Sequence, residues 1–136
     1  MKKRQLFKTL ILLAILLITL HLQFGRNAVI NNSITTPSVG GYEAILTVTA
    51  NKLVILNPRA YATALAAQVA DNSFPNFMFS YDQLGYPNEL NVTVYTNAFT
   101  KRLGMPAFSF RYTSDDSESY NIGEHPEQFH VILDTD

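Results

Sequence analysis

The chain has 136 residues, ten of them basic and eleven acidic, and it contains no cysteine and no tryptophan. Without cysteine it can carry neither a disulfide framework nor a lipid-modified cysteine, so a folded region must be held by its own core or by partners. Residues 26–136 hold six basic and all eleven acidic side chains, a net charge of −5. This balance argues against binding to nucleic acid or to anionic lipid.

A long apolar segment follows a short basic stub at the N-terminus. Residues 1–5 include Lys2, Lys3 and Arg4, and residues 6–24 then form an almost unbroken apolar run. A helix of that length spans about 28 Å, close to the ~30 Å hydrocarbon core of a bilayer. We therefore predict a transmembrane signal-anchor over residues 6–24 that contacts membrane lipid. The residues expected at its centre are Leu10, Ile11, Leu12, Leu13, Ile15, Leu16, Leu17 and Ile18.

The same run has two alternative interpretations, a cleavable signal peptide and a buried helix of a soluble protein. Signal cleavage requires small residues close behind the run, and none stand in suitable positions there. A buried helix would carry a polar face, which this run lacks. Lys2, Lys3 and Arg4 precede the run, Lys8 lies at its start, and only Arg26 follows closely. We therefore expect a cytoplasmic N-terminus and an extracytoplasmic C-terminus. An uncleaved anchor gives a single-pass membrane protein, and cleavage gives a secreted one.

Residues 25–41 are predicted to be a flexible linker. They are rich in asparagine, serine and threonine, and they contain Pro37 and the Gly40-Gly41 pair, which break helices. Residues 42–136 then form the extracytoplasmic domain. Its first segment, residues 42–56, is rich in β-branched side chains and favours a strand, with an interruption near Ala50 and Asn51, over the alternative of a helix.

The clearest local pattern is the start of a helix at Asn57 and Pro58. Asparagine is a preferred N-cap, and proline fits the first helical position because its missing N–H would have no partner there. Residues 59–71 are dominated by alanine, the best helix former. Asn72, Ser73 and Pro75 are expected to end this helix.

After Pro75 the apolar residues alternate with a period of two, which is typical of strands. Residues 76–82 and 89–97 are predicted to form an antiparallel hairpin, and residues 107–113 and 129–134 two further strands. The expected fold is therefore α+β: an N-terminal transmembrane helix, then one helix packed on a small, mainly antiparallel sheet of four to five strands.

Aromatic side chains alternate along two of these predicted strands. We expect them to share the sheet face that receives the helix, and a ligand-binding aromatic surface is the alternative interpretation. The six residues are Phe77, Phe79, Tyr81, Phe108, Phe110 and Tyr112.

No local motif for catalysis or cofactor binding is present. The exported part has two histidines, no Gly-x-Ser-x-Gly elbow and no phosphate-binding glycine loop, so we predict no catalytic residues, no cofactor and no enzymatic activity. Weak metal-ligand candidates lie in one acidic stretch whose spacing matches no calcium loop. They are Asp115, Asp116, Glu118 and His125, with Glu124 and His130 nearby. A solvated acidic loop is the favoured interpretation.

The layout predicts a membrane-anchored interaction or structural subunit of a cell-envelope assembly, with protein partners in or near the membrane. An apolar N-terminal helix ahead of a small sheet-bearing head is similar in outline to pilins and pseudopilins, which implies assembly into a filament. The glycine-and-glutamate processing motif of those proteins does not flank the run. A third possibility is a secreted ligand-binding domain or small enzyme, released if the signal is cleaved.

Overall fold

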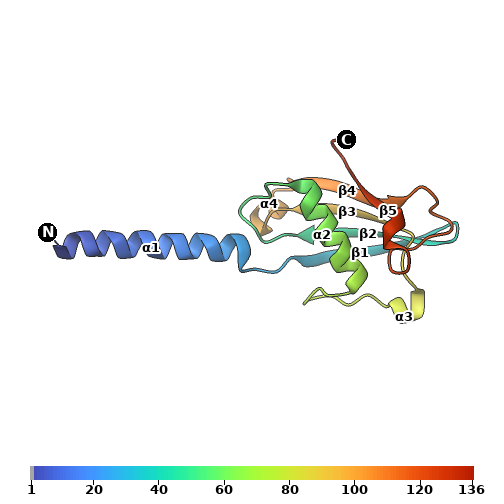
Figure 1. The fold of residues 1–136 in the computed structure, drawn as a ribbon, viewed down its shortest axis with the longest axis horizontal. Helices are drawn as coiled ribbons and strands as arrows, with labels where there is room; N and C mark the ends of the chain where they lie inside the picture. The colour runs from blue at the N-terminus through green and yellow to red at the C-terminus, as the bar shows by residue number, and fades with distance from the viewer. Residues whose placement is uncertain (1) are drawn as a thin grey trace.

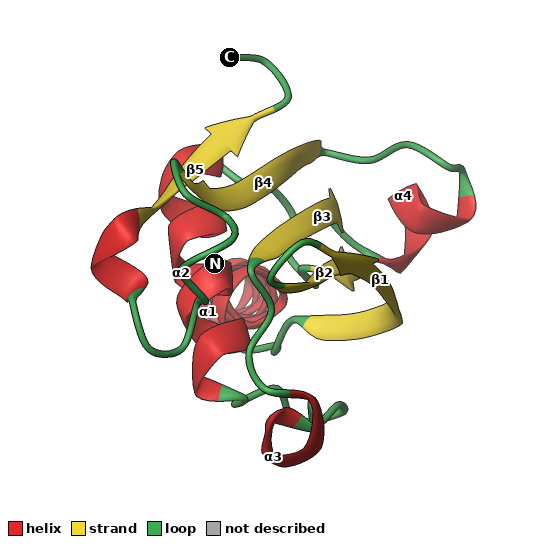
Figure 2. Cartoon of the chain, turned by 90° about the vertical axis from the view of Figure 1, so that its right-hand side faces the viewer, coloured by secondary structure: helices red, strands yellow, loops and turns green. Residues whose placement is uncertain are grey.

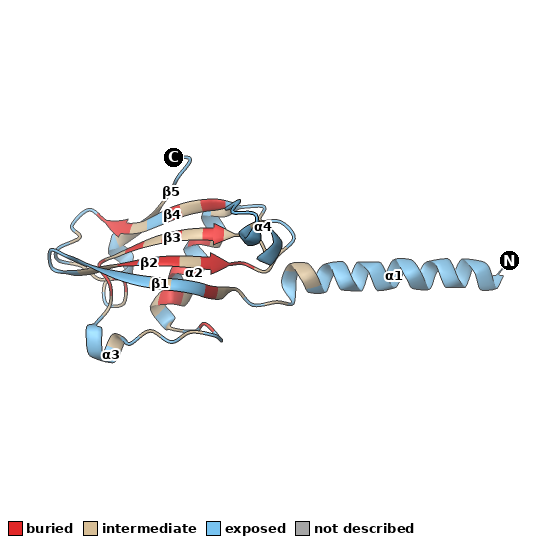
Figure 3. Cartoon of the chain, turned by 180° about the vertical axis from the view of Figure 1, so that it is seen from behind, coloured by how far each residue is buried: buried red, intermediate tan, exposed pale blue. Residues whose placement is uncertain are grey.

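A long helix leads into a single sheet with shorter helices around it (Figure 1). The structure is a computed structural model and describes residues 2–136. Helix α1 (Lys2–Phe24) has no buried residue, and it extends away from the sheet in both side views (Figures 1 and 3). It is long and apolar enough to cross a membrane or to serve as a signal sequence.

The sheet has five strands in the order β1-β2-β3-β4-β5 (Figure 2). Their bounds are β1 Val29–Ser38, β2 Gly41–Thr49, β3 Glu89–Tyr95, β4 Phe108–Ser114 and β5 Phe129–Leu133. The β2–β3 pair is parallel, and the other three pairs are antiparallel. The predicted α+β class with a mainly antiparallel sheet is confirmed.

Helix α2 (Pro58–Asp71) makes the crossover that the parallel β2–β3 pair requires. Its predicted N-cap is confirmed, because the Asn57 side chain accepts a hydrogen bond from the Ala60 N–H and Pro58 opens the helix. Asn72 ends it in the left-handed conformation, with φ 56° and ψ 42°. Its N–H bonds back to carbonyls of the last turn, so the predicted end of the helix is also confirmed.

The core lies between α2 and one face of the sheet. Alternate residues of the central strands point towards the helix, and the alanines of α2 let it lie close to them. The buried residues of this layer are Ala44, Leu46, Val48, Ala62, Leu65, Ala66, Val69, Leu90, Val92, Val94, Phe108 and Phe110. The opposite face carries polar side chains such as Thr93, Ser109 and Arg111, so the sheet is covered on one side only.

The prediction of a flexible linker over residues 25–41 is wrong for most of that range. Residues Val29–Ser38 form β1, which pairs antiparallel with β2 from Val29↔Thr49 to Ser38↔Gly41. Only Ile30 of this strand is buried. An edge strand exposed on both faces needs few apolar residues, and it tolerates Pro37.

The predicted hairpin of residues 76–82 with residues 89–97 is also wrong. Residues 76–80 form a loop, and residues Tyr81–Leu84 form the short helix α3. The Asn72 side chain accepts the Phe79 N–H at 2.8 Å and donates to the Phe79 carbonyl at 3.0 Å. These bonds use backbone groups that a strand would offer to its neighbour, so β3 pairs with β2 and β4 instead.

Two further boundaries differ from the predictions. The strand expected over residues 42–56 ends at Thr49, just before the interruption expected at Ala50 and Asn51, and it does not resume; Asn51 adopts a left-handed backbone with φ 56°. The connection between β3 and β4 contains a second short helix, α4 (Ala98–Arg102), whose N-terminus carries a capping box between Asn97 and Thr100. A 3-10 turn, η1 (Pro126–Gln128), precedes β5.

Candidate functional site

The C-terminus of α1 is fastened to the sheet domain by the side chain of Gln23. Its Oε1 atom accepts the N–H groups of Leu53 at 2.9 Å and Val54 at 3.1 Å, and its Nε2 atom donates to the Val54 carbonyl at 2.8 Å. One amide side chain thus bonds the loop between β2 and α2 as a neighbouring strand would. The long helix is therefore joined to the domain at its last turn, with no free tether between them.

Basic side chains complete this junction by neutralising the end of α1. Lys52 donates to the Gln23 carbonyl at 3.0 Å, and its ammonium lies 5.4 Å from the centre of the Phe24 ring. Arg26 donates two hydrogen bonds to the Leu22 carbonyl, at 3.0 and 3.3 Å. The last carbonyls of a helix lack partners within the helix and carry partial negative charge, so these cations stabilise α1 where it meets the domain.

The junction continues into α4 through Lys52. The Lys52 N–H donates to the Thr96 carbonyl at 2.9 Å, and the Lys52 carbonyl accepts from the Asn97 side chain at 3.3 Å. Asn97 is also the residue that caps α4. A continuous set of hydrogen bonds therefore links the end of α1, the loop after β2 and the start of α4.

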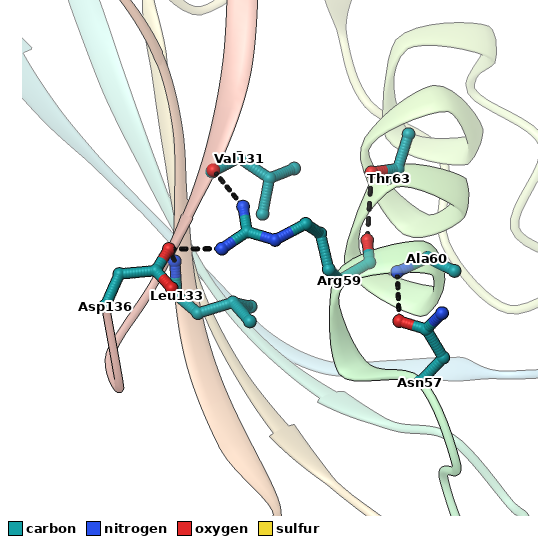
Figure 4. A network of polar contacts seen from close by, with 7 residues as sticks. All are labelled: Asn57, Arg59, Ala60, Thr63, Val131, Leu133 and Asp136. Carbon is teal, nitrogen blue, oxygen red and sulfur yellow. Dashed lines mark hydrogen bonds and ion pairs between the residues drawn. The ribbon is translucent and has the colours of Figure 1, made fainter.

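The outer edge of β5 is closed by a second polar network, shown in Figure 4. Asp134 donates its N–H to Ser109 of β4, so in this antiparallel pair Val131 and Leu133 direct their backbone groups away from β4. Arg59 of α2 donates to the Val131 carbonyl at 2.9 Å, and Asp136 accepts the Leu133 N–H at 3.0 Å. The Arg59 guanidinium also pairs with Asp136.

This network lowers the pKa of the Asp136 carboxyl. The hydrogen bond from Arg59 is the largest cause, and the bond from the Leu133 backbone adds to it. Because both partners are substantially exposed, the ion pair contributes little stability. Its structural effect is to occupy the backbone groups of an edge strand, which would otherwise be open to another chain.

The β1 edge is open by comparison. Asn76 closes its first part, because its side chain bonds both the N–H and the carbonyl of Ile30, at 3.1 and 2.9 Å. Within residues 2–136, the backbone of residues 32–38 is hydrogen-bonded to β2 alone. These residues are mostly exposed.

The six aromatic residues predicted to share one sheet face do not lie on one face. Phe77, Phe79 and Tyr81 cluster beside the end of α2: Phe77 meets Phe79 edge-on at 4.8 Å, and Phe79 stacks on Tyr81 at 5.3 Å between ring centroids. Phe108 and Phe110 lie on β4 beneath α2, where Tyr61 meets Phe108 edge-on at 6.4 Å. Tyr112 lies on the same face of β4, where it packs against Phe129 at 5.2 Å between ring centroids. The error follows from the segment before β3, which is not part of the sheet.

The stacked aromatics border only a small hollow. It lies between β1 and residues 77–84 and has a volume of about 140 Å³, below the roughly 300 Å³ at which pockets for small molecules begin. Tyr81 donates from its hydroxyl to the Val69 carbonyl at 2.8 Å. Burial raises the pKa of Tyr81, and the neighbouring Tyr42 and Tyr86 raise it further. This cluster packs the domain and does not form a ligand cavity.

The weak metal-ligand candidates are not brought together. Asp115, Asp116 and Glu118 lie on an exposed turn after β4, whereas the His125 ring packs against Tyr120 with centroids 5.0 Å apart. Within residues 2–136, no three histidine, aspartate or glutamate side chains lie where they could share one ion. The geometry gives no support to a metal centre at this loop.

Sequence reasoning missed the junction, which is the most developed polar arrangement outside the core. Gln23 falls at the end of the predicted span, residues 6–24, and Lys52 within the strand predicted over residues 42–56, and neither position indicates a contact between them. The separation of Gln23 from its partners by about thirty positions leaves no local pattern. Comparison with known protein families finds no matching model, and the curated proteins and solved structures give no match either.

Proposed function

We propose that the protein is a single-pass membrane subunit that holds a small α+β domain against the extracytoplasmic face of a membrane, where the domain binds other proteins. The observation that carries this proposal is the junction at Gln23. An apolar helix with no buried residue ends in a set of hydrogen bonds to the domain. That arrangement suits a permanent anchor, because cleavage within or behind α1 would discard or separate the groups that the junction joins.

The open edge of β1 supports binding to protein partners. Residues 32–38 of β1 pair with β2, and the outer edge of β1 offers unpaired backbone groups to an added strand. The opposite edge of the sheet is closed by Arg59 and Asp136. A strand from a partner protein can therefore add at the β1 edge of the sheet.

The topology is tested by labelling single cysteines, since the native chain has none. Ser119→Cys lies in an exposed loop of the domain, and Lys3→Cys lies before the span. We expect a membrane-impermeant maleimide to label Ser119→Cys in intact cells and Lys3→Cys only after permeabilisation. The reverse pattern would contradict the proposed orientation, and a mature mass lacking α1 would replace the anchored subunit with a secreted domain.

Partner binding is tested with a photo-crosslinking amino acid at two exposed strand positions. Thr36 lies on the open edge strand β1, and His130 lies on the closed edge strand β5. We expect crosslinks to other membrane proteins from position 36 and not from position 130. Equal crosslinking from both positions, or none from position 36, would contradict strand addition at β1.

A further inference from the structure

Three segments at the end of the domain that faces α1 are grouped together, apart from the C-terminal residues 134–136, which follow β5 at the same end and carry Asp134 and Asp136, the latter paired with Arg59. The three segments are residues 25–28, 50–57 and 96–107, which follow or precede the strand ends at Thr49, Tyr95 and Phe108. Figures 1 and 3 show α4 at this end of the sheet, on the side from which α1 leaves. We call these three segments the proximal surface.

Charge is segregated onto the proximal surface. It contains Arg26, Lys52, Lys101 and Arg102, and none of the eleven acidic residues of the chain. Arg26 and Lys52 are engaged with the end of α1, whereas Lys101 and Arg102 are exposed. The net charge of the whole exported part therefore does not describe these three segments, which are cationic within an acidic domain.

Large apolar side chains are exposed on the same surface. Phe99 and Leu103 lie one turn apart along α4 and its cap, with 69% and 54% of their surface exposed. Met105 is 61% exposed and Leu56 is 86% exposed. Exposed aromatic and aliphatic residues next to basic ones are typical of surfaces that lie in the interface of a membrane.

The junction holds the proximal surface directly at the end of the span formed by α1. Residues 6–24 span about 28 Å as a helix, no more than the hydrocarbon core. Gln23, at the end of that span, bonds directly to Leu53 and Val54. When α1 crosses a membrane, the loop that it contacts must lie at the level of the lipid headgroups.

We propose that the proximal surface lies in the headgroup layer of the bilayer that α1 crosses, with Lys101 and Arg102 binding the phosphates of anionic lipids and Phe99, Leu103 and Met105 inserting between them. The inference rests on the proposed membrane anchorage. An open hollow of about 420 Å³ beside β1 has both basic residues in its wall and gives room for a headgroup. The net charge of −5 on residues 26–136 does not oppose contact between these cationic segments and anionic lipid.

The experiment compares an environment-sensitive fluorophore at three single cysteines of the full chain in vesicles. Leu13→Cys lies in α1, Leu103→Cys on the proximal surface, and Leu84→Cys at the end of α3 on the opposite side of the domain. Leu103 and Leu84 form a matched pair, because both are exposed leucines, at 54% and 61%, that end short helices. Vesicles contain phosphatidylcholine alone or with phosphatidylglycerol, and the quenchers are lipids with a nitroxide near the headgroup for Leu103→Cys and Leu84→Cys, and lipids with a nitroxide deep in the acyl chain for Leu13→Cys.

We expect quenching at Leu103→Cys and none at Leu84→Cys, with stronger quenching of the former when phosphatidylglycerol is present. Replacing both Lys101 and Arg102 by Gln should lower the ratio of docked to undocked domain by about fivefold per charge, since a basic residue near an anionic surface contributes about 1 kcal/mol. High salt should have a similar effect on the native chain.

Each other outcome overturns a defined part of the proposal. Quenching at Leu13→Cys without quenching at Leu103→Cys removes the inference and leaves the anchor intact, whereas no quenching at Leu13→Cys removes the anchor itself. A blue-shifted but unquenched fluorophore at Leu103→Cys would mean that protein, a second copy included, covers the surface. If quenching at Leu103→Cys changes neither with phosphatidylglycerol nor with the two substitutions, the role given to Lys101 and Arg102 is overturned.

Discussion

The two ends of the sheet differ both in charge and in how their loops are held. The proximal surface has four basic residues and no acidic one, and its polar groups fasten it to α1. The opposite end, residues 39–42, 81–88 and 115–125, has five acidic residues and no lysine or arginine. We call it the distal end.

The distal end is held by its own loops, with Asn88 at their centre. Asn88 is only 6% exposed, accepts the Tyr42 N–H at 3.2 Å and donates to the Tyr120 carbonyl at 2.9 Å. Close packing around it excludes larger residues, because a Cβ atom on Gly41 would lie 1.9 Å from the Asn88 side chain. The polar groups of the distal end therefore stabilise the domain itself, whereas those of the proximal surface bond it to α1.

The largest effect on stability is expected from Asn88→Ala at the distal end. The substitution leaves a backbone N–H and a backbone carbonyl without their partner, at about 1–3 kcal/mol for each buried group, so we expect a loss of about 2–4 kcal/mol. Urea unfolding of the full chain in detergent, followed by tyrosine fluorescence, measures it. Asn32→Ala on the exposed edge strand is the control, with an expected change below about 0.5 kcal/mol. Equal losses would remove the special role of the distal asparagine.

Asn57→Ala tests the loop that leads from the proximal surface into α2. Loss of the bond from its side chain to the Ala60 N–H should cost about 1 kcal/mol. Asn57→Ser keeps an acceptor at the N-cap and should stay within a few tenths of a kcal/mol of the native chain. If Asn57→Ala costs as much as Asn88→Ala, the two ends do not differ in stability as we describe.

Tyr81→Phe tests how the stability of the distal end depends on pH. At neutral pH it should cost about 1 kcal/mol, because the hydrogen bond to the Val69 carbonyl is lost. Burial raises the pKa of Tyr81 in the folded state above its usual value of 10. The folded state thus keeps this proton to higher pH, so the contribution is complete below pH 10 and is lost as the pH rises beyond it. The difference between native and variant chains should shrink in urea unfolding series above pH 10, and a constant difference would refute it.

The smallest effect on stability is expected from Gln23→Leu, which acts on orientation instead. The domain keeps its core, so its free energy of unfolding should change by less than about 0.5 kcal/mol. Distances between spin labels at Leu16→Cys in α1 and Ser119→Cys in the domain should broaden markedly, because three hydrogen bonds of the junction are lost. Thr19→Ala is the control, since its hydroxyl bonds only within α1. An unchanged distribution would show that the junction does not fix the domain.

Local patterns predicted the elements that depend on local chemistry. Asn57 and Pro58 start α2 as expected, and the alternation along β3 and β4 places Val92 and Phe110 in the core. The length and apolar composition of α1, which suit a membrane span or a signal sequence, were equally evident from the sequence. These features need only neighbours along the chain.

The remaining features depend on partners far along the chain. β1 resembles a linker because an edge strand is stabilised by its backbone bonds to β2 and buries only Ile30. The loop of Phe77 and Phe79 resembles a strand, yet Asn72 takes the Phe79 backbone. The proximal surface was hidden because Lys52 lies about 45 positions from Asn97 and joins it only in the fold.

The parallel pairing of β2 with β3 has a consequence for the order in which the chain acquires structure. β1 and β2 are consecutive in the chain and pair as an antiparallel hairpin, and β3, β4 and β5 form a second antiparallel unit. The seam between these units joins Glu43 to Glu89, 46 positions later. When the residues that follow α1 emerge in chain order, the edge of β2 that pairs with β3 stays unpaired until β3 arrives. Through that interval the hairpin has a free edge that is open to self-association.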